Sequence, residues 1–70
     1  MKIIYVIQDT KTKEYFWQYR INEGWDVSLI DAKEYASLDD ALKDMREDYL
    51  SEEFEGKTVE IKVYYKFKEC

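Results

Sequence analysis

Residues 58–68 read TVEIKVYYKFK, and this stretch decides the fold. Hydrophobic side chains occupy every second position from Val59 to Phe67, and charged residues or Tyr64 stand between them. Successive side chains of a β-strand point to opposite faces of a sheet. This strict period of two therefore predicts a long strand with one apolar face, in a sheet that is covered on that face.

An amphipathic helix is predicted before this strand, over residues 37–50. Its apolar residues recur at spacings of three and four, which places them on one side of a helix; they are Leu38, Ala41, Leu42, Met45 and Tyr49. Ser37 is a suitable N-cap, and Asp40 stands three residues later, as in a capping box. Gly56 is a suitable turn residue between the helix and the strand.

A β-hairpin is predicted at the start of the chain. Residues 2–8 (KIIYVIQ) and 14–21 (EYFWQYRI) are rich in β-branched and aromatic residues, and a short polar segment separates them. The length of the loop sets the register of the two strands, and we consider the register that a four-residue loop at 10–13 would give. The facing pairs are then Asp9 with Glu14, Val6 with Trp17 and Ile4 with Tyr19.

A second turn is predicted at residues 22–24, where Gly24 can adopt a positive φ. Residues 25–36 are ambiguous: the first half alternates in hydrophobicity, which favours a strand, whereas Ala32 and Tyr35 suit either a short helical turn or a second short strand. We expect a short strand somewhere within this stretch. The order of elements is β-β-(β)-α-β. We expect a single α+β domain over residues 1–70, a small and mostly antiparallel sheet of three to four strands with one amphipathic helix across one face.

Both faces of the predicted hairpin carry apolar side chains, and one helix can cover only one of them. Part of the apolar surface is therefore expected to remain accessible. Either loops and lysine stems cover the second face, or it associates with another chain.

Composition excludes several classes of site. The 70 residues include no histidine, no proline and one cysteine, at position 70. An internal disulfide, a zinc site and a Cys–His catalytic pair are therefore excluded. No apolar run approaches the roughly 20 residues that cross a bilayer, and a signal-peptide pattern is absent. We expect a cytoplasmic protein that is not an enzyme, without catalytic residues, cofactor, metal or membrane contact.

Charge is distributed unevenly along the chain, whose net charge is −5. Residues 31–55 contain ten acidic and three basic side chains, a net charge of −7, so the rest of the chain carries +2. Carboxylates in the first turn of a helix favour its dipole, but those near its C-terminal end do not. The helix and the residues after it hold the candidate partner-binding carboxylates Asp39, Asp40, Asp44, Glu47, Asp48, Glu52, Glu53 and Glu55. They either keep the protein soluble or bind a basic groove.

Direct nucleic-acid binding is the weaker alternative. Tyr15, Trp17, Tyr19 and Arg20 could form a stacking platform on a strand. A chain this short needs such rings in its core, and the negative net charge opposes the approach of phosphates. We therefore expect no direct contact with nucleic acid.

Three segments resemble small accessory proteins of Gram-positive bacteriophages and mobile elements. These segments are Tyr5-Val6-Ile7-x-Asp9-x-Lys11-Thr12-Lys13-x-Tyr15, Gly24-Trp25 and Asp31-Ala32-Lys33-x-Tyr35-x-Ser37-x-x-x-Ala41. Many such proteins have glycine where this chain has Lys13. The resemblance implies a phage-encoded protein that acts in the host cytoplasm, and it carries over no site residue.

The functional hypothesis combines charge and resemblance. A non-enzymatic protein-binding module, encoded by a phage, would inhibit a host nucleic-acid-acting or defence protein. Its acidic helix surface would imitate nucleic-acid charge and bind a basic groove of the host protein. The alternative is a homo-oligomeric structural or regulatory domain, such as a homodimer that associates through the open sheet face.

Overall fold

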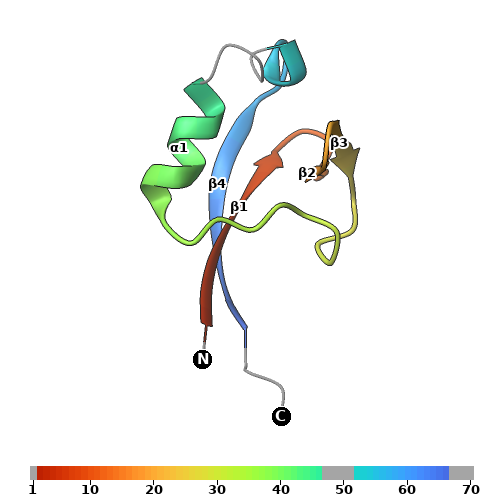
Figure 1. The fold of residues 1–70 in the computed structure, drawn as a ribbon. Coiled ribbons are helices and arrows are strands. Elements are labelled where there is room, and N and C mark those ends of the chain that lie inside the picture. Colours follow the sequence, from red (N-terminus) through yellow and green to blue (C-terminus); the bar gives the residue numbers. More distant parts are fainter. Residues whose placement is uncertain (1, 47–51, 67–70) are drawn as a thin grey trace.

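The computed structural model describes residues 2–46 and 52–66 and shows an antiparallel four-stranded sheet with one helix alongside it (Figure 1). Along the chain the elements are β1 (Lys2–Asp9), β2 (Tyr15–Tyr19), β3 (Asn22–Asp26), α1 (Leu38–Arg46) and β4 (Val59–Lys66). The strands lie in the order β3-β2-β1-β4. The predicted α+β fold is confirmed. The third strand lies at Asn22–Asp26, mostly on residues predicted to form a turn, and it shares only Trp25 and Asp26 with the ambiguous residues 25–36.

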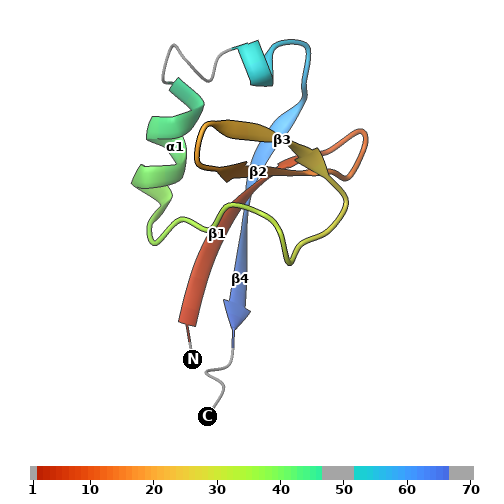
Figure 2. The same ribbon diagram turned by 45° about the vertical axis from the view of Figure 1, so that its right-hand side comes forward.

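The longest pairing in the sheet joins the inner strand β1 to the edge strand β4, and the two lie side by side along their whole length (Figures 1 and 2). Their register runs from Lys2 opposite Lys66 to Asp9 opposite Val59. The first strand of the chain is therefore paired with the last. Ile4, Val6 and Ile7 of β1 are at most 1% exposed, because β1 is covered on both faces.

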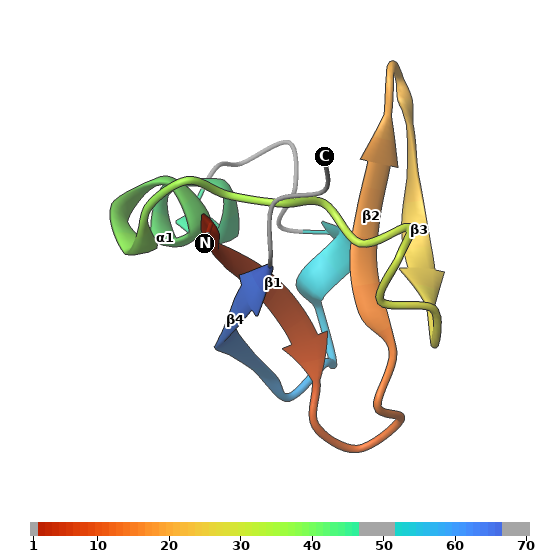
Figure 3. The ribbon, with the colours of Figure 1, turned by 90° about the horizontal axis from the view of Figure 1, so that it is seen from below.

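The hairpin between β1 and β2 has the predicted register only at its closed end. The N–H of Asp9 donates to the carbonyl of Glu14 at 2.8 Å, and Gln8 faces Tyr15. Beyond this point the strands separate, because the β2–β3 hairpin turns steeply across β1 and β4 (Figure 3). The predicted pairing of Val6 with Trp17 and Ile4 with Tyr19 is therefore wrong.

Residues 32–36 fill the gap that opens between β1 and β2. Tyr5 and Tyr35 exchange two backbone hydrogen bonds of 2.9 and 2.8 Å. The N–H of Lys33 donates to the carbonyl of Phe16 at 2.9 Å. Where β1 and β2 no longer pair with each other, residues 32–36 thus form backbone hydrogen bonds with both strands.

The same connection covers the face of β1 that α1 leaves open. Ala32 and Leu29 pack with Ile4 and Val6, and Tyr15 and Tyr64 complete this second apolar cluster. The expectation that apolar surface remains accessible on this face is wrong for Ile4 and Val6. The loop interpretation is the one the packing supports.

Helix α1 begins as predicted: Oγ of Ser37 accepts a hydrogen bond from the N–H of Asp40 at 3.1 Å. Ala41 is fully buried, and Met45 packs against the cluster that contains Ile7 and Phe16. The predicted end of the helix, residues 47–50, lies outside the described residues. A short helical turn follows at residues 52–54.

The turn between β2 and β3 lies two residues earlier than predicted. Arg20 adopts a φ of 58°, whereas Gly24 lies within β3 opposite Trp17 and does not need a positive φ. A Cβ atom at Gly24 would come within 3.0 Å of Cζ2 of Trp17. A larger residue here would press on the indole ring and push it aside by a few tenths of an ångström. Gly56, the predicted turn residue before β4, lies in a turn and has a positive φ of 76°.

Candidate protein-binding site

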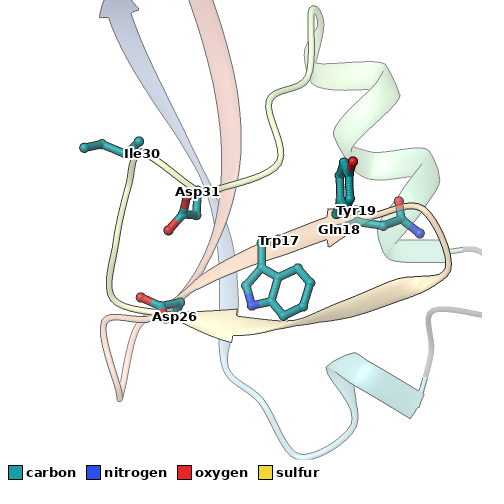
Figure 4. Close-up of a pocket in the computed structure, with 6 residues that line it drawn as sticks. All are labelled: Trp17, Gln18, Tyr19, Asp26, Ile30 and Asp31. Atoms are coloured by element: carbon teal, nitrogen blue, oxygen red, sulfur yellow. The ribbon is translucent and has the colours of Figure 1, made fainter.

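A hollow of about 490 Å³ opens on the outer side of the β2–β3 hairpin (Figure 4). Its lining combines hydrophobic and acidic side chains: Trp17, Gln18, Tyr19, Asp26, Ile30 and Asp31. Figure 4 shows the Trp17 ring lying along the hairpin, with Asp26 and Asp31 toward one end of the hollow. We call these six residues the hairpin hollow.

Alternation along β2 creates the hydrophobic part of the hairpin hollow. Phe16 points inward and is fully buried against Trp25 and Phe54, with ring centroids 5.6 and 5.1 Å away. The neighbouring Trp17 and Tyr19 point to the opposite face. Trp17 is half-buried and Tyr19 is 66% exposed, so the predicted core position of Tyr19 is wrong.

The acidic part comes from the chain that leaves β3. Oδ1 of Asp26 accepts a hydrogen bond from the N–H of Ser28 at 2.8 Å, which turns the chain back toward β2. Ile30 lies on this return and is 88% exposed. Its neighbour Asp31 is also exposed. An aromatic ring beside two carboxylates suits a side chain with an apolar stem and a cationic end, such as arginine or lysine.

The carboxylates predicted to bind a partner do not form one uninterrupted surface. Asp39 and Asp40 are exposed in the first turn of α1. Glu52 and Glu55 are exposed beyond the other end of the helix, and Glu53 is half-buried. Glu47 and Asp48 lie outside the described residues. The structure thus separates the described acids into a group at each end of α1.

Asp44 is bound within the protein. Its Oδ2 lies 2.7 Å from Nζ of Lys33 and accepts a hydrogen bond from the Tyr35 hydroxyl at 2.6 Å. Nζ of Lys33 also donates to Oε1 of Gln18 at 2.5 Å. The side chain of Asp44 is only 15% exposed. This carboxylate therefore joins α1 to the segment before it and to β2.

Glu23 lies beside this polar cluster. Burial is the main cause that raises the pKa of its carboxyl, and the negative charges of Glu53 and Asp44 raise it further, whereas Lys33 lowers it. Nε2 of Gln18 lies 3.4 Å from Oε2 of Glu23 and connects it to the cluster. On the inner face of the hairpin, the carboxylates of Glu23, Glu53 and Asp44 thus lie near one another, and the positive charge of Lys33 partly offsets their repulsion.

A second hollow, of about 450 Å³, lies between α1 and residues 33–36. Asp40 and Asp44 both line it, but so do Lys33 and Lys43. The acidic surface that the sequence suggests is interrupted here by two cations. This hollow is therefore a weaker candidate for a basic partner than the hairpin hollow.

Sequence reasoning missed the hairpin hollow. The alternation of Tyr15, Trp17 and Tyr19 was visible, but it indicated a core face or a stacking platform. The signal that could have identified the outer face is Phe16. Because side chains alternate along a strand, a buried Phe16 places its neighbours Tyr15 and Trp17 on the opposite face of the hairpin.

Metal coordination and membrane spanning find no support in the described part of the chain. Residues 2–46 and 52–66 contain no group of three or more acidic or thiol side chains placed to hold a metal ion. Over the same residues, every helix is too short or too polar to cross a bilayer.

Comparisons with protein-family models, curated proteins and solved structures found no match to this chain.

Proposed function

We propose that this chain is a non-enzymatic protein-binding module that docks on a basic surface of another protein. The observation that carries the proposal is the hairpin hollow, in which exposed hydrophobic side chains lie beside the carboxylates of Asp26 and Asp31. Exposed apolar surface with a polar rim is typical of protein interfaces.

The exposed carboxylates at the two ends of α1 supply the long-range part of this proposal. Asp39 and Asp40 at one end, with Glu52 and Glu55 at the other, would attract a cationic partner and accelerate its approach. Asp44 is excluded from this role, because Lys33 and Tyr35 already bind it. The contact energy would come from Trp17, Tyr19 and Ile30.

The more specific form of the proposal is an inhibitor of a host nucleic-acid-acting or defence protein, encoded by a phage and active in the host cytoplasm. What supports it is the net charge of −7 over residues 31–55, which resembles the charge that a nucleic-acid channel attracts. The sequence resemblance to phage accessory proteins supports the origin alone.

Two isoleucines provide a matched test. Ile30 and Ile21 are 88% and 95% exposed, but only Ile30 lines the hairpin hollow. Immobilised Ile30→Asp and Ile21→Asp variants are incubated with a bacterial lysate, and the captured proteins are compared with those of the unmodified chain. We expect Ile30→Asp to lose the specific band at least tenfold and Ile21→Asp to retain it.

The salt dependence of capture tests the electrostatic part separately. Removing the charges of Asp39 and Asp40 should reduce the slope of affinity against salt, because steering is screened by ions. If Ile30→Asp captures as much partner as Ile21→Asp does, the hairpin hollow is not the contact surface and the proposal fails.

A further inference from the structure

The outer edge of β4 is unpaired among the described residues. β4 is the last strand in the order β3-β2-β1-β4, and it runs for eight residues, from Val59 to Lys66. Long unpaired edge strands are templates for pairing with another strand, and proteins usually shorten or block them. This strand contains no proline, and the register with β1 has no bulge.

The hydrogen bonds of β1 show which residues of β4 face outward. Tyr5 uses both its N–H and its carbonyl on Tyr35, on the side of β1 away from β4. In an antiparallel pair, a residue whose backbone groups point away faces a residue whose groups also point away. Val63, which faces Tyr5, therefore directs its N–H and carbonyl to the free edge. Ile61 and Tyr65 do the same, two residues to either side.

Side chains along this edge are exposed as well. Val63 is 48% exposed and Tyr65 is 61% exposed, and the facing Ile3 of β1 is 47% exposed. All three lie on the same face of the sheet as Ile61, whose side chain packs into the core beneath α1. An apolar patch thus extends from the core to the free edge of β4.

We propose that a second copy of this chain pairs with β4 in antiparallel fashion, about a two-fold axis at Val63. The facing pairs are then Val63 with Val63, Ile61 with Tyr65, Lys62 with Tyr64 and Glu60 with Lys66. The first two kinds of pair exchange two backbone hydrogen bonds each, because their groups already point outward. Glu60 of each copy then lies opposite Lys66 of the other, so residues of opposite charge face each other; within one copy, Glu60 pairs with Lys62 and Lys66 with Glu34.

Charge selects this register over its neighbours. The outward N–H and carbonyl groups of β4 belong to Ile61, Val63 and Tyr65, and in the dimer they must face the same groups of the other copy. Each strand can therefore shift against the other only in steps of two residues, each of which moves the two-fold axis by one residue. An axis at Lys62 places two Lys62 side chains directly opposite, and an axis at Tyr64 places Lys62 opposite Lys66. Like charges directly opposite destabilise a strand pair. An axis at Ile61 avoids this conflict but shortens the ladder to residues 59–63, from residues 60–66.

Disulfide capture distinguishes this arrangement from random collision. Residues that face each other in a hydrogen-bonded pair have Cα atoms about 5.5 Å apart, which a disulfide can bridge. In a Cys70→Ser background, Val63→Cys should therefore form a covalent dimer in oxidised glutathione. Tyr65→Cys is the matched control, since each such cysteine would face Ile61 and lie about 13 Å from its counterpart.

The expected result is a covalent dimer from Val63→Cys at least tenfold faster than from Tyr65→Cys. The average mass of the unmodified protein in solution should also increase from 8.6 kDa toward twice that value as its concentration is raised to about 1 mM, as expected of a weak interface. Equal cross-linking of the two cysteine variants, faster cross-linking of Tyr65→Cys, or no cross-linking of either would overturn the proposal. This outcome is independent of the partner that the hairpin hollow binds.

Discussion

The Tyr35 hydroxyl donates a 2.6 Å hydrogen bond to Oδ2 of Asp44, and this bond ties the segment that fills the gap beside β1 to the helix that covers its face. Lys33 binds the same carboxylate from the same segment. The contact explains a charge that appears unfavourable in the sequence, where Asp44 stands four residues before Asp48. The negative charge of Asp44 thus stabilises the contact between α1 and the segment before it.

Replacing Asp44 with asparagine should therefore destabilise the protein. The variant keeps an acceptor for Tyr35 but leaves Lys33 without its counter-charge. We expect the free energy of unfolding in urea to fall by about 1–2 kcal/mol. Asp39→Asn is the control, since Asp39 is exposed in the same helix, and it should change stability by less than about 0.5 kcal/mol. Equal effects of the two substitutions would contradict the structural role of Asp44.

The pair Tyr15–Tyr64 predicts a pH dependence. Their hydroxyls lie 2.9 Å apart, and this hydrogen bond, together with burial, raises the pKa of Tyr64 to about 12. The unfolded value is about 10. The folded state thus holds this proton more tightly, so the contribution to stability is complete below pH 10 and is lost as the pH rises toward 12.

Substituting Tyr15 with phenylalanine tests this assignment. The variant should lower the pKa of Tyr64 toward 10, followed by NMR of tyrosine labelled at Cζ. Tyr19→Phe, which removes an exposed hydroxyl, should leave the titration of Tyr64 unchanged. A titration of Tyr64 that is the same in Tyr15→Phe as in the unmodified protein would show that the hydrogen bond is not the cause.

The contact between Gly24 and Trp17 predicts that one substitution has opposite effects in two backgrounds. In the unmodified protein, Gly24→Ala pushes a Cβ against the indole and should cost about 1 kcal/mol. In Trp17→Leu, the same change should stabilise by about 0.5 kcal/mol, because alanine restricts the unfolded chain more than glycine does. The measurement is a double-mutant cycle in urea. An equal change in both backgrounds would mean that the ring does not require glycine here.

The short helical turn at residues 52–54 is expected to anchor the hairpin. Phe54 packs edge-on to Trp25 with centroids 5.4 Å apart, and Nε1 of Trp25 donates to the carbonyl of Glu53 at 3.1 Å. Phe54→Ala should lower the free energy of unfolding by about 2–3 kcal/mol and shift the Trp25 fluorescence to longer wavelength. Tyr19→Ala removes a ring of similar size from the surface and should cost less than about 1 kcal/mol.

Local patterns predicted the elements but not their spatial relations. The β4 strand, the α1 helix and its Ser37 cap depend on neighbouring residues, and these are confirmed. The predicted cover of the apolar face of β4 is only partly right, because Ile61 packs into the core whereas Val63 and Tyr65 are 48% and 61% exposed. The hairpin register was correct only where the loop controls it. Further along, the connection between β3 and α1 bonds to β1 and β2 in place of the pairing between them, and such a contact between distant segments has no local signal.

The candidate site illustrates the same limit. Charge counting selected Asp44 together with exposed carboxylates, because sequence spacing does not show that Lys33 and Tyr35 reach it. The hairpin hollow combines Trp17 with Ile30, which meet only because the chain reverses after Asp26. Such a site cannot be predicted from sequence spacing, because it depends on the conformation of the loop after Asp26.

The pairing of β1 with β4 also constrains when this protein can fold as it is synthesised. β1 leaves the ribosome well before residues 59–66, which form the strand it pairs with. Until those residues emerge, Ile4, Val6 and Ile7 have no complete core to enter. Pairing between the ends of a chain is slow, because the intervening loop must close first. A nascent chain that has not yet reached β4 therefore lacks part of its core, which makes it a candidate substrate for ribosome-associated chaperones.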